Sequence, residues 1–116
     1  MKRELKLDLD LHVVPVEGWR RELYQDNTDL TWINPSPNMR NLTEAVLYPG
    51  IGLLEFMKLS VGRGTETPFE VIGAPYLDSV ALIKYLETYK LPGITFADID
   101  YPPPAPNYKA ELCCGL

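Results

Sequence analysis

Apolar and polar residues alternate strictly near the start of the chain, over residues 5–16. The apolar positions of this stretch are Leu5, Leu7, Leu9, Leu11 and Val13. A period of two predicts a β-strand with one apolar face, and Gly18 ends the pattern. A single strand is not stable alone, and no partner follows nearby in the sequence, so this face is expected to be unusually exposed. His12 falls on the polar face among acidic residues, where a solvated or salt-bridged histidine is expected.

The middle of the chain predicts two short helical segments. Asn41 and Thr43 are both candidate N-caps of a helix that Tyr48-Pro49-Gly50 should end. Residues 51–59 are apolar around a single acid, Glu55, and this pattern fits either a helix or a strand. We favour a helix for the first half of that segment.

The clearest helical period in the chain runs over residues 79–90. Short strands are predicted on either side of this helix, over residues 69–72 and from residues 94–97 onward in phase to Tyr101. Residues 111–116 form an apolar patch with no predicted closing element. Together with the unpaired first strand, this patch predicts that the chain is a piece of a larger protein.

Composition narrows the class of protein. With 116 residues, of which 46% are hydrophobic and 23% charged, the chain is globular and forms one domain or less. Its formal net charge of −5 argues against nucleic acid as a partner, since that would require a basic surface. No apolar run is long enough to span a membrane, and the N-terminus does not resemble a signal peptide. The adjacent Cys113 and Cys114 do not suit a zinc site with a single distant histidine, so no metal or cofactor is expected.

The stretch VGRGTETPFE, residues 61–70, places Arg63 between Gly62 and Gly64. Glycine permits a positive φ, so this loop can hold a guanidinium in one irregular conformation, where it can fork onto a carboxylate. Glu55 interrupts an apolar run, and a carboxylate there must face water or find a partner such as Arg63. The residues leave open a structural ion pair or a pair that faces a ligand at the floor of a cleft.

A series of short motifs runs through the chain in one order. They are W-x-x-P-S-P-N (32–38), Y-P-G (48–50), L-x-E (53–55), S-V-G-R-G-T-x-x-P-F-E (60–70), G-A-P-Y (73–76), L-P-G-I-x-F (91–96) and Y-K-A-E-L-C (108–113). From about Leu7 to Cys113 the sequence resembles the bacterial exo-β-N-acetylmuramidase family of peptidoglycan recycling, long described as a domain of unknown function. Each motif is weak alone, but the combination is highly specific.

The resemblance implies a glycoside hydrolase that removes N-acetylmuramic acid from the non-reducing ends of peptidoglycan fragments. It implies an α/β fold in which residues 1–65 are the end of a Rossmann-like subdomain with cleft loops. Residues 66–116 would be the truncated start of a smaller C-terminal α+β subdomain. The family's catalytic glutamate lies in an N-terminal part that this chain lacks, so no catalytic residue is expected here and the chain should be inactive alone. Its expected partners are a muramyl saccharide and that missing N-terminal half. Family members are often exported, to the periplasm or the medium.

The glycines around Arg63, the acid inside an apolar run and the resemblance together predict Glu55, Ser60, Arg63 and Thr65 as substrate-binding residues. Muramic acid carries a lactyl carboxylate, which an arginine on a rigid loop suits well. One departure concerns the residues after Glu55, where the family usually has Gly-Thr-Asn and this chain has Phe56-Met57-Lys58. An alternative function is therefore a non-catalytic sugar-binding or interaction module derived from the family.

Overall fold

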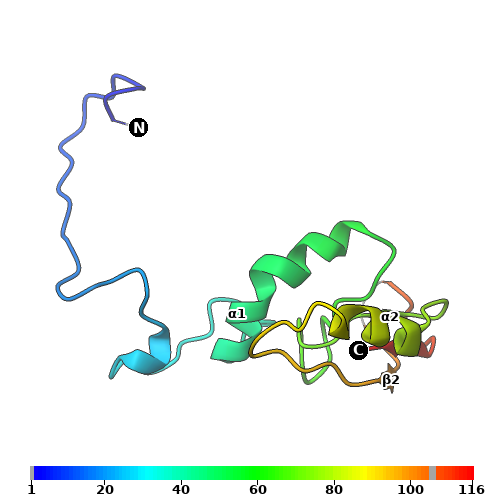
Figure 1. Cartoon of the computed structure of the whole chain (residues 1–116). Helices are drawn as coiled ribbons and strands as arrows, with labels where there is room; N and C mark the ends of the chain where they lie inside the picture. The colour runs from blue at the N-terminus through cyan, green and yellow to red at the C-terminus, as the bar shows by residue number, and fades with distance from the viewer. Residues whose placement is uncertain (1, 105–106) are drawn as a thin grey trace. The chain divides into compact units, whose positions relative to one another are not determined.

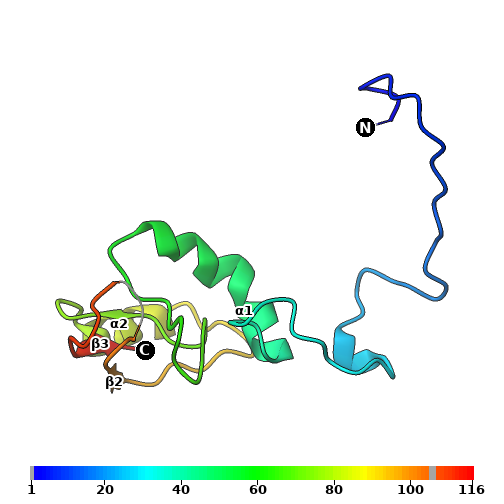
Figure 2. The same cartoon turned by 180° about the vertical axis from the view of Figure 1, so that it is seen from behind.

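The computed structural model of the chain describes residues 2–104 and 107–116. The chain divides into two compact units, Met1–Leu30 and Thr31–Leu116. Both α-helices and the sheet belong to the second unit, as the backbone shows from two opposite sides (Figure 1, Figure 2). The first unit contains one short 3₁₀ helix among its described residues, η1 (Gln25–Asn27).

The strand predicted over residues 5–16 is wrong. Residues 7–16 have no regular secondary structure, and no described residue pairs with them in a sheet. Backbone hydrogen bonds here close only a local turn, from the N–H groups of Lys6 and Leu7. The alternating pattern specifies a strand only where a neighbour supplies hydrogen bonds and cover, and the described chain supplies neither. The expected exposure is confirmed, since the alternating side chains are exposed, from 41% at Leu9 to 78% at Val13.

The first α-helix, α1 (Leu42–Ile51), begins where the sequence predicts it. Asn41 is its N-cap, because its side-chain oxygen accepts the backbone N–H of Glu44 at 2.9 Å. The predicted end at Tyr48-Pro49-Gly50 is wrong, since the helix contains Pro49 and continues to Ile51.

The chain accommodates Pro49 by changing from an α-helix to a 3₁₀ helix shortly after it. Proline removes one helical N–H, and the chain tightens afterwards into the 3₁₀ helix η2 (Gly52–Phe56). The helical first half predicted for residues 51–59 is therefore confirmed, and it presents Glu55 from its first turn.

The second α-helix, α2 (Ser79–Glu87), confirms the helix predicted over residues 79–90, with an earlier end. Asp78 caps it by accepting the N–H of Ala81 at 2.9 Å. Residues 88–90 donate to carbonyls three residues back, so the last turn tightens instead of extending the α-helix. Lys90 then has a φ of 49°, which ends the helical path.

A small antiparallel sheet joins β1 (Gly73–Ala74), β2 (Ile99–Tyr101) and β3 (Cys113–Gly115) in the order β1-β3-β2. The strand predicted at residues 69–72 is wrong, since β1 begins only at Gly73. At residues 69–72 the reason is local, since Phe69 lies in a turn with a φ of 64°. The strand predicted from residues 94–97 in phase to Tyr101 is confirmed over Ile99–Tyr101, whereas residues 94–97 are not part of it.

The central strand β3 is the closing element that the sequence pattern does not predict. It lies in the apolar patch at residues 111–116 and pairs with both other strands. Ile72 and Leu116 extend the pairing by exchanging backbone hydrogen bonds of 2.9 and 3.0 Å. A core cluster of Val71, Tyr101 and Cys113 lies at this sheet.

The observed architecture is a mixture of helices and a small antiparallel sheet, an α+β arrangement. The Rossmann-like subdomain and the division of the chain after residue 65 stay predictions. No helix within the described residues has the length and apolar character that crossing a membrane requires.

The choice between the two candidate N-caps of α1 is testable. Asn41→Ala should lower the free energy of unfolding by about 1 kcal/mol, because it leaves the Glu44 N–H without its side-chain acceptor. Thr43→Ala removes an exposed side chain inside the helix and should cost less than about 0.5 kcal/mol. Urea denaturation followed by far-ultraviolet circular dichroism measures both, and equal losses would contradict Asn41 as the cap.

Candidate functional site

The candidate site is the irregular loop of residues 60–70. Gly62 and Gly64 have φ values of 74° and 82°, in the left-handed region that favours glycine. A Cβ on Gly62 would lie 2.6 Å from Cγ2 of Val71, so this glycine is also required for close packing. The backbone N–H and the hydroxyl of Thr65 donate to the Gly62 carbonyl at 3.0 and 2.6 Å. The loop is therefore closed by its own hydrogen bonds.

Arg63 and Glu55 form the expected ion pair. Nε of Arg63 donates to Oε1 of Glu55, and Nη2 donates to Oε2 at 2.8 Å, which is the forked geometry of a bidentate pair. The guanidinium carbon also lies 4.8 Å from the centre of the buried Phe69 ring. The side chains of Arg63 and Glu55 remain 36% and 29% exposed. Among the described residues, Nη1 of Arg63 has no hydrogen-bond acceptor.

The pair changes the proton affinity of both groups. The hydrogen bond from Arg63 lowers the pKa of the Glu55 carboxyl, although partial burial opposes the shift. The same hydrogen bond raises the pKa of Arg63. Glu55 is therefore a carboxylate at neutral pH, where it can hold a cation but has no proton to donate.

The other two predicted site residues shape the same loop. Ser60 is buried, and its hydroxyl accepts the N–H of Gly62 at 3.4 Å. The hydroxyl of half-buried Thr65 accepts the N–H of Thr67 at 3.2 Å besides donating to Gly62. The structure thus brings Glu55 and Arg63 into contact and uses Ser60 and Thr65 within the loop. A substrate contact by any of these residues stays a prediction.

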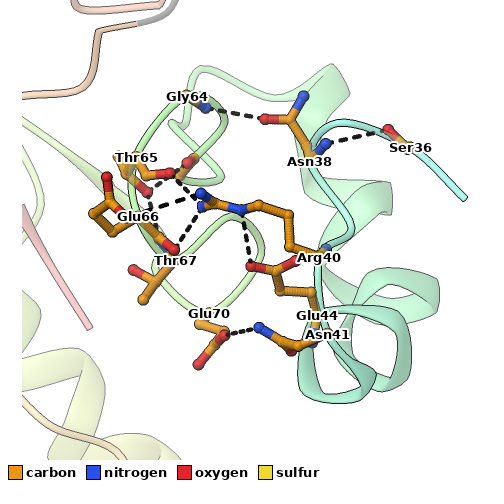
Figure 3. A network of polar contacts seen from close by, with 11 residues as sticks. Ser36, Asn38, Arg40, Asn41, Glu44, Gly64, Thr65, Glu66, Thr67 and Glu70 are labelled. Atoms are coloured by element: carbon orange, nitrogen blue, oxygen red, sulfur yellow. Dashed lines mark hydrogen bonds and ion pairs between the residues drawn. The ribbon is translucent and has the colours of Figure 1, made fainter. Parts of the chain in front are cut away.

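A second polar network contacts the loop, and sequence reasoning missed it (Figure 3). Arg40 donates to two carbonyls of the loop, and Asn38 accepts a loop N–H. Buried Glu44 lies next to Arg40. The only sequence signal for this network is the i, i+4 spacing of Arg40 and Glu44, which is common on helix surfaces.

An apolar cavity of about 440 Å³ lies near the loop. Leu47, Ile51, Leu54, Phe69 and Phe96 are among its lining residues. Sugar recognition requires several convergent polar groups, whereas Glu70 and Thr95 are the polar side chains of this mostly apolar lining. The cavity is therefore poorly suited to binding a saccharide.

Neither cysteine offers a reactive thiolate. Cys113 is buried and Cys114 is half-buried, and desolvation raises the pKa of both thiols. Across the described ranges, no three His, Cys, Asp or Glu side chains come together in a way that could hold a metal ion.

Two family descriptions match the chain. "Exo-beta-N-acetylmuramidase NamZ, C-terminal" matches residues 46–116, and "Exo-beta-N-acetylmuramidase NamZ, N-terminal" matches residues 1–43. The chain therefore belongs to the exo-β-N-acetylmuramidase NamZ family, and the family predicted from the motifs is confirmed.

Individual relatives agree with this assignment. The chain is 40% identical over 114 residues to the peptidoglycan β-N-acetylmuramidase NamZ of Bacillus subtilis (strain 168), a match that covers 98% of this chain and 28% of that protein. A crystal structure of a DUF1343 family protein from Bacteroides fragilis NCTC 9343 aligns with a TM-score of 0.75 at 30% identity. That alignment covers 84% of this chain and 26% of the solved chain. The chain thus spans between a quarter and a third of the length of these relatives.

The Glu55–Arg63 pair predicts a specific dependence of stability on pH. The folded pKa of Glu55 is lowered, so the pair stabilises the fold at neutral pH and is lost as the pH falls through that folded pKa. Glu55→Gln should cost about 0.5–1 kcal/mol at neutral pH, since both side chains are partly exposed. The difference from the unchanged chain should shrink steadily in acid.

Urea denaturation between neutral and acidic pH measures this effect. Glu66→Gln is the matched control, because the Glu66 side chain is 99% exposed and its carboxylate lies 3.8 Å from Arg40. A Glu55→Gln loss that stays constant across the pH range would show that the pair contributes no charge-dependent stability.

Proposed function

We propose that this chain is the part of an exo-β-N-acetylmuramidase that recognises the lactyl carboxylate of a terminal N-acetylmuramic acid. Arg63 would bind that carboxylate. The observation that carries the proposal is the position of the guanidinium, which Glu55 holds along one edge while Nη1 has no acceptor among the described residues. Family membership and the name of the B. subtilis relative support the substrate class.

The chemistry of the sugar makes Arg63 the deciding residue. N-acetylmuramic acid differs from N-acetylglucosamine by its lactyl ether, whose carboxylate is the distinguishing charge. A charge-assisted hydrogen bond to such a group is worth roughly 1.5–3 kcal/mol, which is sufficient to discriminate N-acetylmuramic acid from N-acetylglucosamine. Glu55 fixes the plane of the guanidinium, so that the ligand does not have to order the side chain itself.

The catalytic groups would come from the rest of the enzyme. Glycoside hydrolysis generally uses two carboxyl groups, one of them a general acid with a raised pKa. Glu55 has a lowered pKa and a permanent cationic partner, which suits it to orienting Arg63. We place residues 1–65 at the end of a Rossmann-like subdomain and residues 66–116 at the start of the smaller one, with the site between them. Ser60 and Thr65 would support the loop, and Thr65 would lie beside the ligand.

A second candidate function is a sugar-binding or interaction module without hydrolysis. The departure at Phe56-Met57-Lys58 favours this alternative, because large side chains replace the small polar residues of the family directly after Glu55. The exposed Phe56 would also suit a protein contact. Activity of the completed enzyme separates the two functions.

The isolated chain is expected to be inactive. Incubated with a disaccharide that has N-acetylmuramic acid at its non-reducing end, the chain should release no measurable sugar. A chimaera in which this chain replaces the matching part of the B. subtilis relative should release it. Turnover by the isolated chain that disappears on Glu55→Gln would instead make Glu55 the catalytic acid. An inactive but folded chimaera that still binds the sugar would favour the non-catalytic module.

Arg63→Lys tests the proposed ligand contact in the same chimaera. Lysine keeps the charge but loses the planar fork, so binding of muramic acid should weaken by about tenfold or more. Binding of N-acetylglucosamine, which lacks the lactyl group, should stay within about twofold. Isothermal titration calorimetry measures both sugars, with Arg20→Lys, an exposed arginine outside the loop, as the matched control. Equal weakening for both sugars, or a change in thermal stability alone, would make Arg63 purely structural.

A further inference from the structure

We propose that Arg40 and Glu44 are positioning residues that set the orientation of Arg63. In this role Glu44 holds Arg40, and Arg40 clamps the loop that carries Arg63. The inference rests on the proposed function, since it matters for the ligand only if Arg63 binds the lactyl carboxylate. It adds residues that the family motifs in the loop do not include.

The clamp is a guanidinium that spans two consecutive carbonyls. Nη2 of Arg40 donates to the carbonyl of Thr65 at 2.8 Å and to that of Glu66 at 2.6 Å (Figure 3). A planar guanidinium with several donors can satisfy adjacent acceptors in a fixed arrangement, which a lysine ammonium does less specifically. Arg40 lies just before α1, far from the loop in sequence, so it ties the loop to the start of that helix.

Glu44 explains why Arg40 keeps this position. Its side chain is completely buried, at 0% exposure, and it accepts the backbone N–H of Arg40. Its other oxygen, Oε1, has no hydrogen-bond partner among the described residues and lies 3.8 Å from Nε of Arg40. A buried carboxylate is costly without a counter-charge, and Arg40 is the cation beside it. Moving Arg40 away would leave that charge uncompensated.

The backbone transmits the clamp to Arg63. Gly64, which follows Arg63, donates its N–H to Oδ1 of Asn38 at 3.1 Å, and the next two carbonyls are held by Arg40. Because the glycines on either side of Arg63 have no side chains, they restrict the backbone very little by themselves. The anchors at Asn38 and Arg40 therefore add to the loop's own hydrogen bonds in holding the backbone from which Arg63 meets Glu55.

Arg40 is better suited to this role than to direct ligand binding. Its donors face the loop carbonyls and Glu44, and Nη1 lies 3.8 Å from the carboxylate of Glu66. Asn41, next to it, donates to Glu70 at 3.5 Å, which places a second carboxylate on this side (Figure 3). An anionic sugar would be repelled by these acids, so it is expected to approach the Arg63 edge of the loop.

The test is the hydrogen exchange of the Arg63 Nε–H group, measured by NMR on the ¹⁵N-arginine-labelled chain without ligand. This proton bonds Glu55 and reports whether Arg63 is in place. Arg40→Lys keeps a positive charge beside Glu44 but removes the planar Nη2 group that donates to both loop carbonyls, and should speed the exchange by about tenfold or more. Glu66→Gln, the matched control, should change it by less than about twofold. Glu44→Gln keeps the shape of the side chain and should speed the exchange in the same direction.

The affinity ratio for muramic acid over N-acetylglucosamine in the chimaera is the second readout. Arg40→Lys should lower this ratio by about threefold or more through misplacement of Arg63. Unchanged Nε–H exchange in folded Arg40→Lys and Glu44→Gln would overturn the positioning role. A reduced ratio with unchanged exchange would also overturn it, because Arg40 would then touch the ligand itself. If Arg63→Lys leaves the ratio unchanged while Arg40→Lys still speeds the exchange, the clamp stands and only the proposed function fails.

Discussion

Two arginine–carboxylate pairs hold the irregular loop of residues 60–70, and the shape of the candidate site depends on both. Arg63, which belongs to the loop, donates hydrogen bonds to Glu55. Arg40, which lies beside Glu44, donates to carbonyls of the loop. Both carboxylates belong to one continuous stretch, because α1 passes directly into η2. The loop is thus attached near both ends of a single helical segment, which helps to explain how backbone without regular hydrogen bonding keeps one conformation.

This attachment also gives Pro49 a structural consequence. An α-helix that ended at Tyr48-Pro49-Gly50 would separate Glu55 from the helix that carries Glu44. Because the helix continues to Ile51 and tightens into η2, Glu55 is instead presented from a helical turn. The helical stretch therefore places the buried Glu44 near its start and the half-buried Glu55 near its end, each facing a different arginine.

Much of the local structure could be predicted from the sequence where the signal is local. The cap at Asn41 and the α2 period involve neighbouring residues, and both are present. Two strand predictions fail for the same reason. A strand is predicted at residues 5–16 and is absent, and the central strand β3 is present but is not predicted. Strands depend on partners that are distant in sequence. Alternation therefore predicts a strand at residues 5–16, where no partner pairs, and β3 is missed because its residues do not alternate although two strands pair with it. In the site, the sequence points to the pair of Glu55 and Arg63, which are eight residues apart, but not to the contact of Arg40 with Thr65, which are 25 residues apart.

The electrostatics around the loop do not suit Glu55 or Glu44 to proton donation. A glycosidase acid must carry a proton at its working pH, and enzymes achieve this by burying the carboxyl away from cations. Glu55 has the opposite environment, since a guanidinium forks onto it and lowers its pKa. Glu44 is buried, but it lies against Arg40 and behind the loop carbonyls. Both carboxylates are thus paired with arginines, and neither has the environment that a glycosidase general acid requires.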